Sequence, residues 1–341
     1  MTEIPSALKP FIAKVSEGDT LSFEEASEAF EIIMSGGATP AQIAGFLVAL
    51  RMRGEDVSEI SAAVKVIRAK ALPIKAPADA MDIVGTGGDG SGTLNISTAT
   101  AIVTAACGVP VAKHGNRALS SRSGTADAWS RLGLNLEAPF EQIEQAIREA
   151  GLGFMMAPRH HSSFKYVGPV RMELGIRTLF NILGPLCNPA GVKRYLLGVY
   201  SRQWVRPMAE TLAQLGCEKA WVVHGADGLD ELSTTGDNVV CEVLGTEVRE
   251  FTVGPQEAGL PLASLADLKG GDADYNAQRI RSLLAGEKDA YRDIVLFGTA
   301  AALLIADRVD SLSAGVELAA KAIDSGQAEQ TLTRLISICH P

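Results

Sequence analysis

The chain begins with apolar positions that recur at helical spacing between short polar breaks. Ser22-Phe-Glu-Glu25 is a capping box, in which the serine and glutamate side chains each satisfy a backbone amide at a helix start. The apolar positions that follow predict a helix through Ile33, ended by Gly36-Gly37. Thr39-Pro-Ala-Gln42 repeats the pattern with proline at the first helical position, and predicts a second helix to about Met52.

A third helix and a linker complete this N-terminal region. Asp56-Val-Ser-Glu59 predicts the start of a helix that reaches about Ala71. The prolines of Leu72–Asp79 are typical of a linker. We therefore expect a helical domain over residues 1–75, small enough to need a partner surface, and a second domain over residues 78–341.

Beyond the linker the pattern changes to short apolar runs that alternate with helical segments. Strands are predicted at Met81–Val84, Val109–Ala112, Tyr195–Tyr200 and Ala220–His224, and helices at Thr98–Cys107 and Arg206–Leu215. This alternation is typical of an α/β domain in which helices pack on a mostly parallel sheet. Such sheets bind ligands at the carboxyl ends of their strands.

Two segments rich in glycine and hydroxyl groups follow the first two predicted strands. The first is Gly85-Thr-Gly-Gly-Asp-Gly90 with Asn95-Ile-Ser-Thr98, and the second is Lys113-His-Gly-Asn-Arg117 with Ser120–Asp127. Backbone without a Cβ can approach an oxyanion closely, and N–H groups turned into a concavity bind anions. Asn95–Thr98 also suits a helix start that holds phosphate oxygens, although an ordinary cap by Asn95 or Ser97 is the alternative there. Together the segments point to a highly phosphorylated substrate.

Charge is unevenly distributed along the chain of 341 residues, whose formal net charge is −9. This acidic balance argues against nucleic acid as a partner. The windows Gly90–Leu136 and Gly151–Tyr200 nevertheless hold ten of the 31 basic residues and only two of the 40 acids. Uneven surface charge is the plain alternative, but an acidic protein with such windows is expected to focus an anionic small molecule.

The composition suits a soluble cytoplasmic α/β enzyme. Hydrophobic residues make up 47% of the chain and aromatic residues only 5%. No signal peptide is evident, and the longest nearly uncharged run, Leu94–Ala112, is interrupted by Gly108 and Pro110, so we expect no membrane partner. The five cysteines show no C-x-x-C spacing, which favours a reduced cytoplasm over disulfides or a zinc site.

Gly85-x-Gly87-x-x-Gly90 also matches the dinucleotide-binding fingerprint. That motif needs a helix that opens at the loop and an acidic residue about twenty positions further on. Here Asp89 lies inside the loop, and Val109-Pro110 occupies the place of the acidic residue. A nucleotide cofactor is therefore not favoured, and the missing Gly-Lys-Ser/Thr excludes a Walker loop.

Taken in order along the chain, these motifs resemble the anthranilate phosphoribosyltransferase family. The matching segments are Asp82–Gly90, Asn95–Thr98, Lys113–Arg117, Met156–His161, Pro169–Arg171, Leu174–Thr178, Asn181–Leu186, Asn188-Pro189 and Asp227–Ser233. The resemblance implies a small helical domain, with an inserted helical segment near residues 168–190, beside a larger α/β domain of the nucleoside phosphorylase and phosphoribosyltransferase type. It implies transfer of the phosphoribosyl group from phosphoribosyl pyrophosphate (PRPP) to the amine of anthranilate, in tryptophan biosynthesis. It further implies a homodimer that pairs through the helical domain.

The resemblance also implies which residues hold the substrates and the Mg²⁺ cofactor. PRPP would be surrounded by Gly85, Gly88, Asp89, Thr93, Asn95, Ile96, Ser97, Thr98, Lys113, His114, Gly115, Asn116, Arg117, Ala118, Leu119, Ser120, Ser121 and Thr125. Anthranilate would contact Gly85, Asn116 and Arg171, and Mg²⁺ would be held by Ser97, Asp230 and Glu231. A guanidinium matches a carboxylate, although Arg171 could instead pair with Glu173. Adjacent carboxylates suit a hard cation, although such a pair is ordinarily just surface charge.

Some residues depart from the family pattern or invite another interpretation. Thr125 stands where the family usually has serine, and Ser162-Ser163 replaces a proline-containing segment. His160-His161 suggests a metal site, but no cysteine or acidic partner stands at ligand spacing, so we expect pocket-lining or structural histidines.

Two alternative functions remain open at this point. A pyrimidine nucleoside phosphorylase-like pentosyltransferase shares the two-domain plan but lacks the Lys-His-Gly-Asn-Arg form found here at 113–117. A non-catalytic relative that binds nucleic acid should have a basic groove and lack the metal carboxylates. Asp230-Glu231 and the sequence pI of about 5.2 speak against it.

Overall fold

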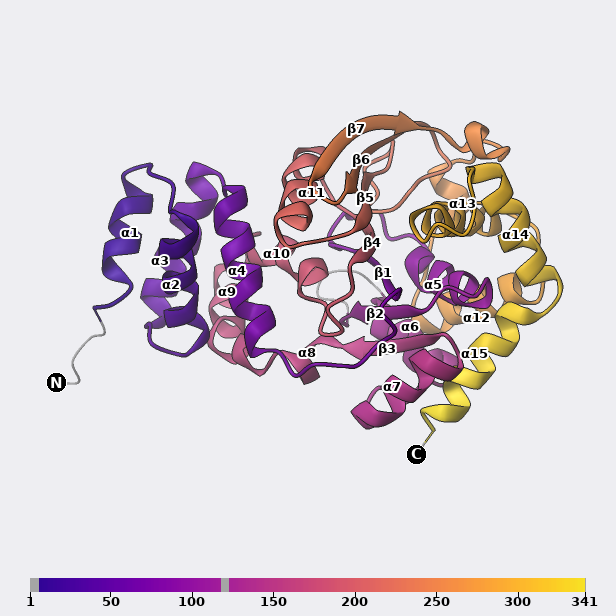
Figure 1. The fold of residues 1–341 in the computed structure, drawn as a ribbon, viewed down its shortest axis with the longest axis horizontal. Coiled ribbons are helices and arrows are strands. Elements are labelled where there is room, and N and C mark those ends of the chain that lie inside the picture. The colour runs from indigo at the N-terminus through magenta and orange to yellow at the C-terminus, as the bar shows by residue number, and fades with distance from the viewer. Residues whose placement is uncertain (1–5, 118–122, 341) are drawn as a thin grey trace.

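The computed structural model describes residues 6–117 and 123–340, and Figure 1 shows a helical bundle at one end of the molecule and an α/β domain at the other. The bundle contains α1 (Lys9–Ser16), α2 (Phe23–Met34), α3 (Pro40–Arg53) and α4 (Val57–Lys70). The capping boxes at Ser22, Thr39 and Asp56 all form, which confirms the three predicted helices. Helix α1 was not predicted, because its start at Leu8 has no side-chain cap.

The α/β domain is built on a seven-stranded sheet in the order β3-β2-β1-β4-β5-β6-β7. Its strands are β1 (Met81–Gly85), β2 (Val111–Gly115), β3 (Leu152–Met156), β4 (Arg194–Gly198), β5 (Lys219–His224), β6 (Asn238–Leu244) and β7 (Glu247–Val253). The pairings among β3, β2, β1, β4 and β5 are parallel, and those of β6 and β7 are antiparallel, so the predicted α/β class with a mostly parallel sheet is confirmed. The strand order reverses between β1 and β4, where parallel sheets form their ligand crevice.

Helices cover the sheet and connect it to the bundle. They are α5 (Ile96–Ala106), α6 (Thr125–Leu132), α7 (Phe140–Glu149), α11 (Val205–Gln214), α12 (Ala273–Leu284), α13 (Ala290–Ile305), α14 (Leu312–Asp324) and α15 (Gln327–Ile338). Helix α5 packs on β1 and against α13, which in turn packs on β4. Helix α11 packs on β5 and β6 and also contacts α4 of the bundle. The first turn of α5 therefore lies at the carboxyl end of β1.

An insertion between β3 and β4 crosses to the bundle and returns. It contains α8 (Ala157–His160), α9 (Gly168–Leu174) and α10 (Phe180–Leu183); α9 packs against α3, and α10 against α4. Figure 1 shows α9 beside the N-terminal helices although it is far from them in sequence. We therefore propose that the helical domain comprises residues 1–75 with the insertion near 168–190, and that the α/β domain comprises the rest of residues 78–341.

The return of this insertion is fastened to the central strands by a buried carboxylate. Asp82 is fully buried in β1 and accepts hydrogen bonds from the His114 amide at 3.2 Å and from Asn188 Nδ2 at 2.7 Å. Asn188 Nδ2 also donates to the Ala112 carbonyl at 2.8 Å. Burial raises the pKa of Asp82 to about 6, against the charge of Lys113, which lowers it. One side chain thus holds β1, β2 and the insertion in register.

Candidate active site

A cleft of about 610 Å³ opens at the carboxyl ends of β1 and β2. Its walls come from both glycine-rich segments, from the loop after β5 and from the insertion that packs on the bundle. The predicted convergence of the two glycine-rich segments is confirmed, because β1 ends at Gly85 and β2 at Gly115. The cleft therefore joins parts of the chain that are distant in sequence.

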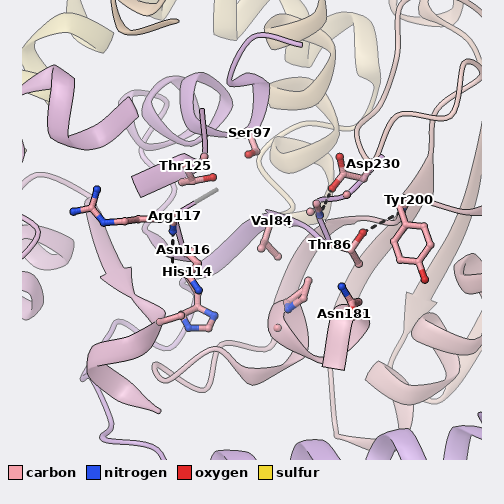
Figure 2. Close-up of a pocket in the computed structure, with 18 of the residues that line it drawn as sticks. Val84, Thr86, Ser97, His114, Asn116, Arg117, Thr125, Asn181, Tyr200 and Asp230 are labelled. Atoms are coloured by element: carbon pink, nitrogen blue, oxygen red, sulfur yellow. Dashed lines mark hydrogen bonds between the residues drawn. The ribbon is translucent and has the colours of Figure 1, made fainter. Parts of the chain in front are cut away.

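The loop after β5 reaches the cleft by packing onto bare strand ends. A Cβ placed at Gly85 or at Gly198 would overlap Asp230, so this approach requires glycine at the end of both β1 and β4. The Gly87 amide donates to Asp230 Oδ2 at 2.6 Å. The carboxylate of Asp230 is thereby fixed at the opening of the glycine-rich loop (Figure 2).

The three predicted metal ligands lie together at this end of the cleft. Glu231 Oε1 accepts a hydrogen bond from the Ser97 amide at 3.1 Å, and Asp230 is the residue that directly precedes Glu231. Burial and then the charge of Asp89 raise the pKa of Asp230, whereas burial and then the charge of Asp230 raise that of Glu231. Acids that repel one another in this way form a donor set that fits a divalent cation.

The donor set fits Mg²⁺ better than a metal that needs a full protein cage. Within residues 6–117 and 123–340, no cluster of three or more histidine, cysteine, aspartate or glutamate side chains is arranged as a metal site. Mg²⁺ usually keeps several waters and binds one or two carboxylates together with substrate phosphates. Two carboxylates and the Ser97 hydroxyl are compatible with this coordination preference of Mg²⁺.

Helix α5 presents its first turn to the cleft. Asn95 is its N-cap residue, but the Asn95 side chain makes no capping bond. The Ile96 amide donates to the Leu94 carbonyl and the Ser97 amide to Glu231, so among the described residues the Thr98 amide is the one in the first turn that is left for another acceptor. The helix begins at Ile96, two residues before the predicted start. Thr98 does not line the cleft: its side chain is fully buried, and Oγ1 meets no hydrogen-bond partner among the described residues. Thr98 can therefore offer a ligand only its backbone amide.

The second glycine-rich segment contributes cations at two depths. Lys113 is buried in the floor and donates from Nζ to the Ile83 carbonyl. Burial lowers its pKa, whereas the charges of Asp82, Glu231 and Asp230 raise it. Arg117 lies at the rim, where it pairs with Asp127 at 3.0 Å. The positive charge predicted for this segment thus acts partly from below the cleft.

The opposite wall carries an arginine that has no acidic partner in the described part of the chain. Arg171 of α9 lines the cleft half-buried, and its guanidinium lies 5.6 Å from the Phe180 ring centroid. Burial lowers its pKa, and no acid in the described part of the chain pairs with it, so the alternative pairing with Glu173 is not formed. A half-buried guanidinium of this kind is suited to an anionic ligand.

The structure also places in the cleft several residues that were not predicted as ligands. Arg177 donates to the Gly88 carbonyl, and its guanidinium lies 4.2 Å from the centroid of the Tyr200 ring. The Tyr200 amide in turn donates to Thr86 Oγ1 at 3.0 Å (Figure 2). Arg177 lies within a motif noted in the sequence, but Tyr200 carries no sequence signal, because it simply follows an apolar strand. Lys165 and Asn181 complete this wall.

Three buried histidines lie behind or within the cleft. The rings of His114 and His161 are 5.2 Å apart in an edge-on arrangement, and His160 stacks on Phe140 at 4.5 Å. Burial lowers the pKa of all three, and that of His161 falls to about 4. They are therefore neutral at physiological pH. His114 and His161 line the cleft, whereas His160 does not.

The predicted site residues are thus largely brought together. Those that line the cleft are Gly85, Gly88, Asp89, Thr93, Asn95, Ile96, Ser97, Lys113, His114, Gly115, Asn116, Arg117, Thr125, Arg171, Asp230 and Glu231. The predicted ligands Ala118, Leu119, Ser120 and Ser121 lie outside the described residues.

Comparison with known families matches both parts of the chain. Residues 9–71 match the glycosyl transferase family, helical bundle domain, and residues 77–329 match the glycosyl transferase family, a/b domain. The anthranilate phosphoribosyltransferase of Rhodospirillum rubrum is 59% identical over 331 residues, which cover 97% of this chain and 95% of that protein. That of Mesorhizobium japonicum is 58% identical over 333 residues, covering 98% and 99%.

Solved structures resemble the chain over nearly its whole length. The anthranilate phosphoribosyltransferase of Thermus thermophilus superposes with a TM-score of 0.92 at 45% identity, covering 97% of this chain and 99% of that one. The Saccharomyces cerevisiae enzyme in complex with PRPP and Mg gives a TM-score of 0.90 at 28% identity, covering 97% of both chains. The same yeast enzyme in complex with 4-fluoroanthranilate gives a TM-score of 0.88 at 27% identity, also covering 97% of both chains.

The buried neutral state of His161 predicts an acid-dependent loss of stability. The pKa of His161 is about 4 in the folded chain and near 6.5 when unfolded, so the unfolded chain takes up the proton first as the pH falls. The contribution of neutral His161 to the free energy of unfolding is therefore fully present above pH 6.5 and is lost as the pH falls toward 4. At pH 5 the loss is about 2 kcal/mol. Urea unfolding of the unchanged chain and of His161→Gln at about pH 7.5 and about pH 5 measures how much unfolding free energy each loses. The variant should lose about 2 kcal/mol less, and equal losses would contradict the assignment.

Proposed function

The chain belongs to the anthranilate phosphoribosyltransferase family, and we propose that its cleft joins anthranilate to PRPP in tryptophan biosynthesis. The enzyme is a pentosyltransferase. The bond between the ribose anomeric carbon and pyrophosphate breaks, a bond to the anthranilate nitrogen forms, and the amine loses a proton. The comparisons do not favour the two alternatives, a pyrimidine nucleoside phosphorylase-like enzyme and a nucleic-acid-binding relative.

One observation carries the placement of the two substrates. At one end of the cleft the Gly87 and Ser97 amides hold the carboxylates of Asp230 and Glu231, and at the other end Arg171 pairs with no acid among the described residues. The first end suits a pyrophosphate with its metal ion, and the second suits an isolated carboxylate. PRPP and anthranilate carry these groups respectively, so a single cleft can hold both and align the amine with the anomeric carbon.

Departure of pyrophosphate is the main chemical difficulty, because the ribose passes through a state that resembles an oxocarbenium ion. The residues that would hold Mg²⁺ are Ser97, Asp230 and Glu231. Bound Mg²⁺ supplies positive charge beside the leaving pyrophosphate. The Thr98 amide at the start of α5 would bind one of its oxygens, and Lys113 would add a fixed charge from the floor.

Anthranilate would be positioned by the insertion and by the second glycine-rich segment. Arg171 would bind its carboxylate, while Asn116 and Gly85 would line the path between its amine and the ribose. We assign no general base, because an aromatic amine that attacks an oxocarbenium-like carbon needs little activation. The neutral histidines His114 and His161 would border the aromatic ring without adding charge.

We further propose a cytoplasmic homodimer that pairs through the helical domain. Met52 at the end of α3 and Met172 on α9 are 80% and 78% exposed, and these two helices pack together. Ile176, which follows α9, is also exposed. Sedimentation that shows only a 35.8 kDa species would contradict the dimer. All five cysteines are unpaired, as a reducing compartment permits, and none of the helices among the described residues could cross a membrane.

The function itself is tested by the loss of anthranilate fluorescence when PRPP and Mg²⁺ are supplied. We expect steady decay with the complete mixture and none when EDTA removes the metal ion, since the leaving pyrophosphate then lacks its counter-charge. Folded protein that leaves the fluorescence unchanged in the complete mixture would refute the transferase function. Phosphorolysis of thymidine or uridine by the same preparation would instead indicate the nucleoside phosphorylase.

The metal carboxylates are tested by the double variant Asp230→Asn with Glu231→Gln. Removing both charges should lower kcat by at least about a hundredfold, because the cation would lose both of its proposed carboxylate ligands. Asp227→Asn is the matched control, since Asp227 is exposed in the same loop and does not line the cleft. The control should keep the magnesium dependence of the unchanged enzyme. A double variant that keeps it too would place the ion elsewhere.

The role of Arg171 is tested by Arg171→Ala and Arg171→Lys. Loss of a charge-assisted hydrogen bond worth about 1.5–3 kcal/mol should raise the KM for anthranilate by roughly tenfold to a hundredfold. Lysine should restore only part of this, because it keeps the charge but loses the bidentate fork. The KM for PRPP should stay close to that of the unchanged enzyme. An unaltered anthranilate KM in Arg171→Ala would show that another group binds the carboxylate.

A further inference from the structure

A segment far along the chain braces the first glycine-rich segment. Thr93 and Lys269 form an antiparallel bridge, flanked by hydrogen bonds from the Leu94 amide to the Leu268 carbonyl and from the Gly270 amide to the Gly92 carbonyl, both at 3.0 Å. A Cβ at Gly270 would overlap the Thr93 carbonyl, so the two backbones are in direct contact. This segment leads directly into α12.

The side chain of Asn95 is held by its carbonyl end. Asn95 Oδ1 accepts hydrogen bonds from Asn276 Nδ2 at 2.9 Å and from Ser123 Oγ at 3.2 Å. The backbone carbonyl of Asn95 accepts from the Tyr291 hydroxyl at 3.0 Å. Among the described residues nothing accepts from Asn95 Nδ2, and Asn95 lines the cleft. The amide nitrogen is thus the end that remains for a ligand.

The orientation of Asn276 is itself determined by the backbone. Asn276 is 1% exposed on α12, and its Oδ1 accepts from the Gly271 amide at 2.9 Å. A backbone N–H can only donate, so the oxygen of Asn276 must face Gly271. Its nitrogen must then face Asn95, and a donor there can pair only with the Asn95 oxygen. The orientation of the Asn276 side-chain amide therefore determines that of the Asn95 side-chain amide.

We propose that Asn276 is a positioning residue that fixes the Asn95 side-chain amide with its NH₂ end toward the oxygens of PRPP. This rests on the proposed function, in which PRPP occupies the end of the cleft around Gly87, Ser97 and Asp230. An amide that turns by half a rotation would present its carbonyl to the phosphates and repel them. Holding Asn95 Oδ1 outward also stops it from capping α5, which leaves the Thr98 amide for the ligand, since the Ser97 amide already donates to Glu231.

Two variants test this polarity against a purely structural role. Asn276→Asp can still accept from Gly271 but cannot donate to Asn95, so it should invert the Asn95 amide. Asn276→Leu removes both contacts and leaves Asn95 free to take either orientation. Binding of PRPP with Mg²⁺ is measured by calorimetry in the absence of anthranilate, and the KM for each substrate is then determined. Asn135→Asp is the control, because it adds the same charge in a loop outside the cleft.

The expected result is a graded loss confined to PRPP. The aspartate variant should raise the Kd for PRPP by at least about tenfold, the leucine variant by a smaller factor, and both should keep the anthranilate KM within about twofold. The ratio between the aspartate variant and the unchanged enzyme should persist at about 0.5 M salt, which screens a distant charge effect. Unchanged PRPP binding in either variant, or a larger loss with leucine, would overturn the proposal. Failure of the unchanged enzyme to bind PRPP would instead refute the proposed function.

Discussion

The contact between Asp230 and the bare ends of β1 and β4 is the constraint on which the rest of the site depends. Side chains at Gly85 and Gly198 would exclude the loop after β5, and with it both acids of the metal end. The cost of bringing Asp230 and Glu231 close to Asp89 is visible in their raised pKa values. Amide donors from Gly87 and Ser97 offset part of that repulsion. A divalent cation would offset the remainder, so the close approach that the two glycines allow produces a pair of carboxylates suited to such a cation.

The charge pattern of the chain becomes intelligible once the cleft is known. Among the cations of the two basic windows, Lys113, Arg117, Lys165, Arg171 and Arg177 line the cleft. Other cations of these windows serve the fold: Arg194 pairs with Asp307 at the far end of the sheet, and Arg159 donates to the Leu136 and Ala138 carbonyls. The windows therefore indicated an anionic ligand correctly, although a basic residue near a glycine-rich segment is not by that fact a ligand. Burial and pairing decide which cations remain for the substrate.

Local chemistry was predictable from the sequence, whereas long-range placement was not. The capping boxes of α2, α3 and α4 each involve residues three apart, so the start of each helix can be recognised from a few consecutive residues of sequence. Helix α1 and strand β3 have no such pattern, and β6 and β7 form a hairpin whose strands were not predicted. The sequence predicted a helix start that holds phosphate oxygens at Asn95, with an ordinary cap as the alternative. The Asn95 side chain instead accepts from Asn276, 181 positions further along the chain. Only the folded chain brings these two together.

The two halves of the site are aligned by contacts that touch neither reacting atom. Arg171 lies on the insertion, whereas Asp230 and Glu231 lie in the loop that packs on the ends of β1 and β4. The distance between these groups therefore depends on how the insertion is anchored. Asn188 ties one end of it to the buried Asp82. Arg177 ties its middle to the glycine-rich loop through the Gly88 carbonyl, and Arg51 of α3 donates to the Arg177 carbonyl. In-line attack tolerates little misplacement of the two reactants. These contacts fix the insertion, and with it Arg171, relative to the glycine-rich loop, so the position of the helical bundle affects how the reactants are aligned.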